Sequence, residues 1–334
     1  MEGRDEHLED NFGRTHEYLR IALTEKCNFR CFYCMPAEGL QLSPADHLMK
    51  AEEIEEIVKI FVEHGVNKVR FTGGEPLIRK DFRDILKRLS KLPVELAITT
   101  NGVLVDKYID DFKRYGLNSV NISMDSLNRE SFKRITRRDN FDKVKKNVKL
   151  LLQSDFNVKL NNVVMKGEND NEIYDFVKLT LMNPLEVKFI EFMPFDGNEW
   201  EWEKARSSEE LLKLIQDYFP GQVEKLDDKK KSTASKYKIA GAEGAFGFIS
   251  TVSEPFCSSC NRLRITADGK MKNCLFSQKE SDLLESYRKG EDIRPKIFQN
   301  VKMKEKMRGG MDTFDKFSND ELNSKNRSMI TIGG

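Results

Sequence analysis

Short apolar runs typical of β-strands alternate with helix-like runs over residues 1–200, and this alternation limits the folds open to the chain. Because parallel strands need a crossover helix between them, six such repeats indicate a parallel sheet. No repeat of solenoid length is visible in the sequence. We therefore expect an α/β fold in which the sheet curls into a partial (β/α)6 barrel of the TIM type.

The expected strands are Leu19–Thr24, Val66–Phe71, Val94–Thr99, Ser119–Ser123, Val158–Met165 and Glu186–Phe192. The expected helices are Ala51–Val62, Asp81–Leu92, Asp106–Tyr115, Phe141–Gln153 and Asn171–Met182.

The rest of the chain has a different pattern. Residues 198–238 are dense in charge and include the run Asp227–Lys231, which predicts a helix followed by an exposed connector. Further on, Arg262–Lys270 predicts a hairpin that turns at its Asp-Gly pair. At 334 residues the chain can form one large barrel or two domains. We expect a barrel domain over residues 1–200 and a C-terminal domain over residues 201–334 that closes the barrel.

The composition excludes several classes of partner. Hydrophobic residues make up 39% of the chain, enough for a large core, and charged residues make up 33%. The net charge is +1, so we expect no nucleic-acid partner and no membrane partner, and an anion site would need a local cluster of basic side chains. The chain shows no apolar run of membrane-spanning length, no signal-peptide region and no Arg-rich transit peptide near Met1.

Three cysteines follow the first expected strand in the spacing C-x3-C-x2-C, at Cys27, Cys31 and Cys34. The chain has 6 cysteines, too few for a disulfide scaffold, and their clustering indicates metal in a reducing compartment. Thiolates select zinc, copper(I) or an iron–sulfur cluster. On a [4Fe–4S] cluster, three thiolates leave one iron open to bind a ligand. A zinc loop or three unrelated core cysteines remain the alternatives.

A second set, Cys257, Cys260 and Cys274, has the spacing C-x2-C-x13-C. The expected hairpin brings Cys274 back toward Cys260, so three thiolates can again converge. A closed zinc site needs four ligands, and no histidine lies near this set. The histidines are His7, His16, His47 and His64. The second set therefore favours another iron–sulfur cluster, with its free iron open to a substrate.

Polar and sulfur-bearing residues stand at or just after the ends of several expected strands. Cys27 follows the first strand, Gly74 the second and Met193 the sixth, while Thr99 and Ser123 close the third and fourth. Because barrel enzymes carry their active sites at the carboxyl ends of their strands, this coincidence predicts a site on that rim.

Basic residues show a two-residue spacing in two expected strands. Arg262 and Arg264 share one face, as do Lys68 and Arg70, because successive strand residues alternate faces. Basic residues on a strand are usually only a solvated face, but in a barrel one face looks into the interior and the other meets helices. Arginine binds phosphate bidentately, so we expect a phosphate site here. Further basic candidates are Arg20, Lys159 and Lys188.

Two segments together resemble the signature of the radical S-adenosylmethionine (SAM) enzymes. They are the first cysteine set, with Tyr33 before its third cysteine, and Gly73–Pro76, which reads GGEP. From about Phe12 to the end, the two cysteine sets, Cys260–Arg264 and the terminal glycine pair resemble the GTP 3′,8-cyclase family of molybdenum cofactor biosynthesis.

This resemblance implies two [4Fe–4S] clusters and SAM as cofactors. Cys27, Cys31 and Cys34 would hold the cluster that cleaves SAM, and the resulting 5′-deoxyadenosyl radical would remove the C3′ hydrogen of GTP. The C3′ radical would attack guanine C8 and give 3′,8-cyclo-7,8-dihydro-GTP, in the first step of the pathway. The second cysteine set would hold a cluster whose free iron binds the guanine edge.

The resemblance also implies roles for single residues. SAM contacts are expected from Tyr33, Gly74, Glu75, Ser123 and Met193. GTP contacts are expected from Arg20, Lys68, Arg70, Thr99, Lys159, Lys188, Arg262 and Arg264. Catalytic positions are expected at Arg262, Arg264, Gly333 and Gly334. Lys188 stands where the bacterial members of the family often have arginine, so its charge is kept but its bidentate geometry is not.

By the same resemblance, GTP is the substrate, a cyclic pyranopterin monophosphate synthase acts downstream, an electron donor is needed, and a homodimer is one option. Glu191–Asn198 looks most like the eukaryotic-type members, which would place the protein in the mitochondrial matrix, whereas a bacterial protein would be cytoplasmic. Two alternatives are a peptide-modifying radical SAM enzyme with an auxiliary cluster and a non-enzymatic zinc-binding interaction protein.

Overall fold

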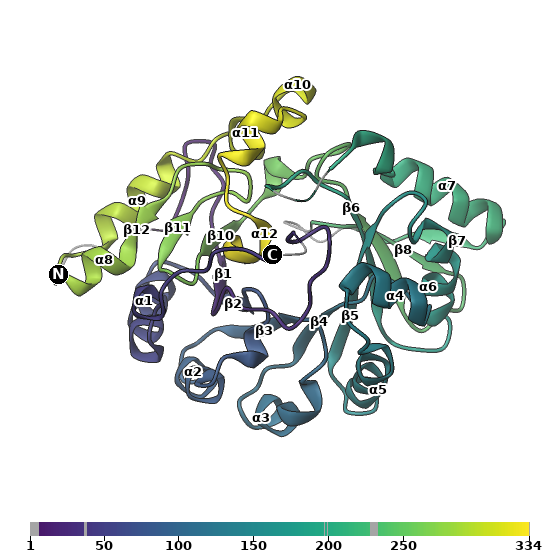
Figure 1. Ribbon diagram of the computed structural model, residues 1–334, viewed down its shortest axis with the longest axis horizontal. Helices are drawn as coiled ribbons and strands as arrows, with labels where there is room; N and C mark the ends of the chain where they lie inside the picture. The colour runs from purple at the N-terminus through teal and green to yellow at the C-terminus, as the bar shows by residue number, and fades with distance from the viewer. Residues whose placement is uncertain (1–6, 37–38, 197, 199, 228–232, 334) are drawn as a thin grey trace.

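The computed structural model describes residues 7–36, 39–196, 198, 200–227 and 233–333. Within these residues the strands form one continuous mixed sheet, in the order β12-β11-β10-β1-β2-β3-β4-β5-β6-β9-β8-β7. Its centre is parallel and curved, with helices on the outer side, as a partial barrel requires (Figure 1). The expected α/β partial barrel is confirmed.

The six expected strands form this parallel centre, and no boundary differs from the expected one by more than two residues. They are β1 (Tyr18–Ala22), β2 (Lys68–Thr72), β3 (Glu95–Thr100), β4 (Ser119–Ser123), β5 (Asn157–Val164) and β6 (Glu186–Glu191). The crossover helices are α1 (Ala51–Glu63), α2 (Phe82–Leu89), α3 (Ile109–Arg114), α4 (Arg129–Thr136), α5 (Phe141–Leu152) and α6 (Ile173–Leu179). Helix α4 was not expected, and a short 3-10 turn, η3 (Val105–Lys107), separates the first part of the expected Asp106–Tyr115 helix from α3.

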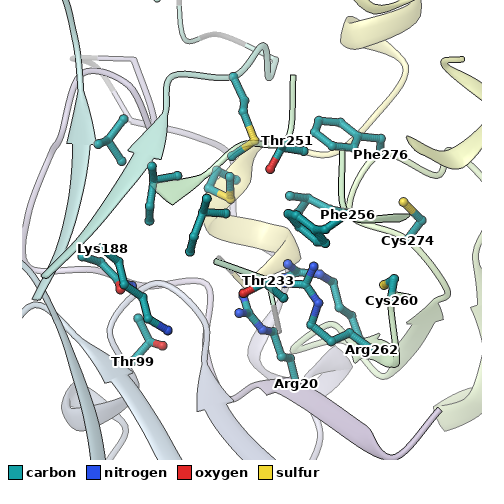
Figure 2. A pocket seen from close by; sticks show the side chains of 18 of the residues that line it. Arg20, Thr99, Lys188, Thr233, Thr251, Phe256, Cys260, Arg262, Cys274 and Phe276 are labelled. Carbon is teal, nitrogen blue, oxygen red and sulfur yellow. The ribbon is translucent and has the colours of Figure 1, made fainter. Parts of the chain in front are cut away.

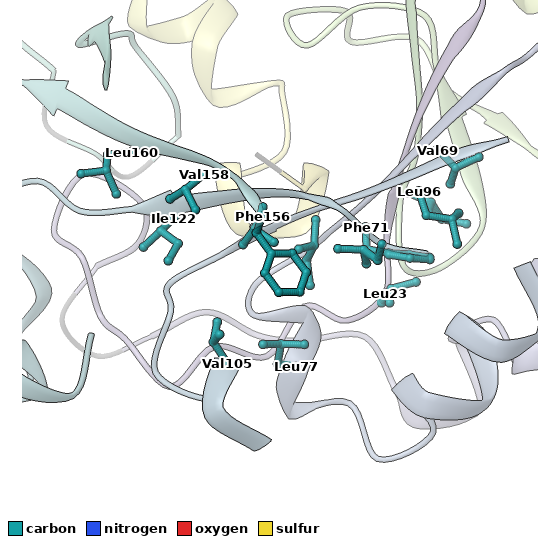
Figure 3. Packing of buried hydrophobic residues seen from close by; sticks show 14 of the residues in the cluster. Leu23, Val69, Phe71, Leu77, Leu96, Val105, Ile122, Phe156, Val158 and Leu160 are labelled. Atoms are coloured by element: carbon teal, nitrogen blue, oxygen red, sulfur yellow. The ribbon is translucent and has the colours of Figure 1, made fainter. Parts of the chain in front are cut away.

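Alternation along the strands divides the two faces of the barrel. On β2, Val69 and Phe71 are fully buried in the apolar layer between sheet and helices (Figure 3). Arg70 lies between them in the sequence and therefore points to the opposite, inner face. The parallel register places Arg20 of β1 beside Arg70 on one side and beside Arg264 on the other. β1 and β2 thus carry apolar residues outward and basic residues inward.

The C-terminal part of the chain extends both edges of this sheet. On one edge β9 (Ala245–Ile249) pairs in parallel with β6, followed by β8 (Ser235–Ile239) and β7 (Val223–Lys225). On the other edge β10 (Arg262–Ile265) pairs in parallel with β1, followed by β11 (Lys270–Lys272) and β12 (Ser281–Asp282). The expected hairpin is confirmed as β10–β11. Because the sheet is continuous, the division at residue 200 stays a prediction.

The expected connector in residues 198–238 is wrong in part. The helix is present as α7 (Ser208–Tyr218), but β7 and β8 lie where we expected no strands. The Tyr237 ring of β8 stacks on the Phe246 ring of β9, with 5.8 Å between the ring centroids. This aromatic packing stabilises the strand although lysines flank Tyr237 on both sides. Charged side chains on an edge strand also discourage pairing with other chains. Most of the charge run Asp227–Lys231 lies outside the described residues.

The remaining helices cover β11 and β12 and then lead the chain inward. They are α8 (Leu283–Arg288), α9 (Arg294–Lys302), α10 (Phe314–Phe317), α11 (Asp320–Ser324) and α12 (Met329–Ile332). Short 3-10 turns are η1 (Ala45–His47), η2 (Pro76–Ile78), η4 (Asp170–Glu172), η5 (Trp202–Lys204), η6 (Cys257–Ser259) and η7 (Arg308–Gly310). Helix α12 lies inside the curved sheet (Figure 1). In the described part of the chain, no helix has the length and apolar character needed to cross a membrane.

Candidate active site

Two neighbouring cavities occupy the interior of the barrel. The larger has a volume of about 240 Å³ and the smaller about 110 Å³. Tyr33, Cys34, Thr99, Ser123 and Met329 line both, so these residues mark the boundary between the two spaces. The expected site at the carboxyl ends of the strands is therefore a pair of adjoining chambers.

The first cysteine set lines the smaller cavity. The backbone N–H of Phe29 donates to Cys27 Sγ at 3.4 Å, and the Asn101 amide lies 3.9 Å from the same sulfur. Burial and the nearby Glu75 carboxylate raise the pKa of the Cys27 thiol to about 11. Burial also raises the pKa of Cys31 and Cys34, and the neighbouring thiols of the set add to it. Three ionised sulfurs therefore need a cationic partner at this place.

The glycines of the GGEP segment bring two loops into close contact. A Cβ atom on Gly74 would lie 2.2 Å from the carbonyl oxygen of Lys26, next to Cys27. Glu75 lines neither cavity among the described residues. Its carboxylate accepts hydrogen bonds from the Thr100 hydroxyl and the Asn101 N–H, both at 2.7 Å. Glu75 thus ties the cysteine loop to the end of β3, and its expected contact with SAM stays a prediction.

The second cysteine set lines the larger cavity, on the wall formed by β10, β11 and the turn before them (Figure 2). Lys304 Nζ donates to Cys260 Sγ at 3.6 Å, and the Arg308 N–H donates to Cys257 Sγ at 3.4 Å. Burial opposes ionisation of Cys260, but the Lys304 and Arg262 cations outweigh it and lower its pKa to about 6. Cys260 is therefore ready to act as a thiolate.

Both cysteine sets fit iron–sulfur clusters by donor chemistry. Each brings three free thiols to one cavity wall, and N–H groups donate to their sulfurs, as at cluster sites. Among the described residues, no three cysteine, histidine or carboxylate side chains gather closely enough for a single metal ion.

Cationic side chains line the larger cavity opposite and beside the second cysteine set. They include Arg20, Arg262 and Arg264 from neighbouring strands and Lys188 from β6 (Figure 2). Within the part of the chain that the structure describes, the Nε atoms of Arg20 and Arg262 and the Oδ1 atom of Asn121 are buried without a hydrogen-bond partner. Unpaired buried polar atoms are costly, so these groups indicate a polar, anionic ligand in the cavity.

Three expected GTP contacts lie outside the cavity lining. Lys68 forms an ion pair with Glu95 at 2.6 Å, and Lys159 forms one with Glu186 at 2.7 Å. Arg70 is buried and donates to the Tyr18 hydroxyl and to the Ile98 carbonyl. These residues form a charged layer beside the cavity, and their contact with GTP stays a prediction.

Lys188 is a basic residue whose pKa is strongly altered by its surroundings. Burial, together with the cations of Lys159 and Arg70, lowers its pKa to about 7 against the opposing effect of Glu186. Its Nζ lies 3.7 Å from a Glu186 oxygen that has no hydrogen-bond partner in the described structure. Lys188 can therefore gain a proton when an anion enters the cavity.

The C-terminal segment completes the inner wall. The Gly333 carbonyl accepts a hydrogen bond from Arg264 Nη1, and Met329 borders both cavities. Gly333 has a φ of +81°, and a Cβ atom there would lie 2.7 Å from Thr72 Oγ1. Only glycine fits this position without displacement. The structure thus places Gly333 against Arg264 and Thr72, and its catalytic role stays a prediction, whereas Gly334 lies outside the described residues.

Several lining residues were not expected. Asn121 and Asn161 point inward on β4 and β5, and polar residues within otherwise apolar strands would have been a signal for them. Asp125 accepts from the Tyr33 hydroxyl at 2.7 Å, and burial raises its pKa to about 6. Arg308 also lines the larger cavity, but no sequence motif around it pointed to this role.

Family models match most of the chain. The Radical SAM superfamily model matches residues 21–180, and the Molybdenum Cofactor Synthesis C model matches residues 185–309. In solved structures, the chain is similar to Streptococcus suis SuiB, with a TM-score of 0.60, 16% identity and coverage of 83% of this chain and 67% of that one. At this identity the similarity concerns the fold alone.

Curated relatives are much more similar in sequence. The chain is 42% identical to the GTP 3′,8-cyclase of Peptoclostridium acidaminophilum, covering 89% of this chain and 92% of that protein. It is 44% identical to the mitochondrial GTP 3′,8-cyclase of Arabidopsis thaliana, covering 98% and 83%. It is 50% identical to the molybdenum cofactor biosynthesis protein moc-5 of Caenorhabditis elegans, covering 84% and 47%. The chain thus spans about half the length of several curated relatives that it matches.

Proposed function

The chain belongs to the radical SAM superfamily and, within it, to the GTP 3′,8-cyclase family of molybdenum cofactor synthesis, and from this premise we propose that it converts GTP into 3′,8-cyclo-7,8-dihydro-GTP. One observation carries the proposal. Two three-cysteine sets line adjoining cavities, and the wall of the larger one carries arginine donors that have no partner among the described residues. This arrangement suits a reaction that starts at one set and acts on an anionic substrate held at the other.

The smaller cavity would hold SAM. A [4Fe–4S] cluster on Cys27, Cys31 and Cys34, when bound, supplies the electron for SAM cleavage and so for the radical that removes the C3′ hydrogen of GTP. Tyr33 and Ser123 border both cavities and would orient the two reactants toward each other. Walls that exclude water from the reacting atoms would prevent side reactions of the radical.

The larger cavity would hold GTP. Cys257, Cys260 and Cys274 would hold the second cluster beside the guanine. Arg20 and Arg262 offer donors that have no partner in the described structure, and Arg264 is held at the Gly333 carbonyl. These donors, with Lys188, would orient the nucleotide and compensate the charge of its triphosphate.

The partners and the compartment remain predictions of this proposal. A cyclic pyranopterin monophosphate synthase would consume the product, an electron donor would reduce the first cluster, and a homodimer is one possible assembly. The mitochondrial matrix is the expected compartment for a eukaryotic-type member, and the cytoplasm for a bacterial one.

The decisive experiment uses protein reconstituted with iron and sulfide under anaerobic conditions. SAM, a strong reductant and GTP are added, and 5′-deoxyadenosine and the nucleotide product are followed by mass spectrometry. We expect GTP-dependent 5′-deoxyadenosine and an isomeric, cyclised nucleotide. Formation of 5′-deoxyadenosine while GTP stays unchanged would contradict the assignment of GTP as the substrate. Zinc in place of iron in the purified protein, with no SAM cleavage after reconstitution, would favour a zinc-binding protein instead.

A further inference from the structure

A short segment, here called the strap, leads the chain from α11 to α12 in the interior of the curved sheet (Figure 1). The strap consists of Lys325–Ser328, between the end of α11 and the start of α12 at Met329. Helix α12 has only 4 residues, so it has no stability of its own. Its position must depend on what holds its two ends. At the inner end, the Arg264 guanidinium binds the Gly333 carbonyl.

At the outer end, Arg327 binds two carboxylates at once. Its guanidinium donates to both Glu280 oxygens, at 2.7 and 2.9 Å, and to both Asp268 oxygens, at 3.0 and 2.8 Å. The exposed fractions are 21% for the Arg327 side chain, 11% for Asp268 and 18% for Glu280. Bidentate pairs that are this well covered are stronger than surface ion pairs, which contribute little.

These acidic groups connect the strap to the loops that carry the cysteines. Asp268 lies in the β10–β11 turn, between Cys260 and Cys274 in the sequence. A third carboxylate, that of the buried Glu25, lies 4.0 Å from the Arg327 guanidinium and two residues before Cys27. Glu25 in turn accepts hydrogen bonds from the Ser43 N–H and hydroxyl. Arg327 therefore joins the strap to both halves of the site.

The residue before Arg327 provides a second attachment. Asn326 Oδ1 accepts from Lys272 Nζ at 2.9 Å, and the Asn326 amide donates to the Leu275 carbonyl at 3.0 Å. Lys272 is fully buried and also donates to the Ser277 carbonyl. Two consecutive strap residues are thus fixed to the wall beside Cys274, immediately before α12 begins.

We infer that Arg327 is a positioning residue that sets how far the C-terminal segment reaches into the barrel. Arg327 lines neither of the two cavities and acts through α12, which begins at Met329 and is followed by Gly333. Its effect on the reaction rests on the proposed function. With the strap detached, the Gly333 carbonyl leaves Arg264 and Met329 leaves the boundary between the cavities. SAM cleavage then proceeds without cyclisation of the nucleotide.

The primary test does not depend on the identity of the substrate. Amide hydrogen exchange is measured on the cluster-loaded protein and on its Arg327→Met variant, which keeps the aliphatic part of the side chain. We expect roughly tenfold faster exchange of the Met329–Gly333 amides in the variant and unchanged exchange in β1–β6. Lys325→Met is the matched control, because it removes an exposed ion pair with Glu321 from the same strap and should leave exchange unchanged. Equal exchange in Arg327→Met and the wild type would overturn the inference.

A second measurement separates positioning from general destabilisation. The ratio of cyclised nucleotide to 5′-deoxyadenosine should fall about tenfold in Arg327→Met at saturating GTP, and Arg327→Lys should restore part of it. Glu280→Gln should lower the ratio less than Arg327→Met does. Its effect should largely disappear in the Arg327→Met background, because each change removes the contact between Arg327 and Glu280. The inference would be contradicted if the effects of the Glu280 and Arg327 substitutions on the ratio were fully additive. It would also be contradicted if a variant with fast exchange in Met329–Gly333 kept a normal ratio of cyclised nucleotide to 5′-deoxyadenosine. If the wild type forms no cyclised nucleotide, the proposed function fails while the exchange result still decides the role of Arg327.

Discussion

At the scale of single residues, the larger cavity is defined by basic side chains held close together by the sheet. Arg20 and Arg264 are neighbours in the β1–β10 register, and burial together with Arg20 and Arg262 lowers the pKa of Arg264. Like charges held this close need an anion between them. A triphosphate that enters the cavity would therefore relieve repulsion as well as form hydrogen bonds.

Arg264→Ala tests this arrangement at its buried centre. The change removes a charged donor from the cavity, and charged hydrogen bonds are worth about 1.5–3 kcal/mol. We therefore expect the Kd for GTP to rise roughly ten- to hundredfold. SAM cleavage should continue, because the first cysteine set is untouched. Titration with GTP and assay of 5′-deoxyadenosine measure the two effects. Equal loss of both would argue against a substrate-binding role.

Lys188 should make GTP binding depend on pH. Its pKa of about 7 in the free protein means that the side chain loses its charge above neutrality, while a bound phosphate requires the charged form. Affinity should therefore fall by up to about tenfold per pH unit between about pH 7 and 9, with proton uptake on binding. Calorimetry in buffers of different ionisation enthalpy would detect that uptake.

Lys188→Arg gives the control for this pH dependence. Arginine stays protonated throughout the range, so the decline in affinity should flatten in the variant. An unchanged slope of affinity against pH would assign the dependence to another group, such as Tyr18. Burial raises the pKa of Tyr18, but the cations of Arg70 and Arg20 outweigh it and lower that pKa to about 7.

Sequence patterns identified the site residues that belong to motifs and missed those that act only through three-dimensional position. Both cysteine sets, Arg262 and Arg264 line the cavities as expected. Arg308 and Asp125 come from loops with no motif, and only packing brings them to the cavity wall. The reverse holds for Glu75, which lies in a clear motif but forms hydrogen bonds within the loops.

At the scale of elements, the loop after β2 and the cysteine loop after β1 depend on each other. Gly74 allows the two backbones to meet, and a Cβ atom there would approach the Lys26 carbonyl to 2.2 Å. The backbone N–H of Gly74 also donates to the Thr24 carbonyl at 2.7 Å. The geometry of the first cysteine set is therefore fixed by a glycine in the loop that follows β2.

Gly74→Ala should lower the iron content of the first cluster and weaken SAM binding, because the displaced backbone moves Cys27. Iron per protein and the spectrum of each cluster measure this, and the second cluster should stay intact. Gly116→Ala serves as the control, since its φ of +69° is strained for alanine but nothing lies within 4 Å of the added Cβ. Normal SAM binding in the Gly74 variant would disprove the dependence.

Helix α12 gives a second prediction at this scale. Gly333→Ala places a Cβ atom 2.7 Å from Thr72 Oγ1 and 2.8 Å from Ala22 Cβ, at a φ of +81°. The backbone alone costs about 1–2 kcal/mol, and the contacts push the segment outward. We expect both clusters to remain and the cyclised product to fall at least about tenfold. A fully active Gly333→Ala protein would show that the segment tolerates displacement.

At the scale of the whole molecule, one sheet unites the two halves of the chain. β1 pairs with β10 and β6 pairs with β9, so both edges of the barrel are covered by strands from the C-terminal part. The alternating pattern of residues 1–200 predicted the six central strands, because each follows a local apolar run. It could not predict how the later strands attach, since pairing across the chain leaves no local pattern.

A fragment of residues 1–200 should therefore fail to fold as a soluble monomer. Its β1 and β6 would expose open edges, and such edges associate with other chains. Size-exclusion chromatography and thermal unfolding of the fragment, compared with the whole chain, test this expectation. A monomeric fragment with a cooperative transition would instead support an independent barrel domain.

The pairing of β1 with β10 also sets the order of events during synthesis. Tyr18 leaves the ribosome well before its partner Arg262. Until then, one edge of the first strand stays open, and contacts between distant residues form slowly. The edge of β1 thus stays unpaired until Arg262 has been made, and an unpaired strand edge is prone to aggregation during synthesis.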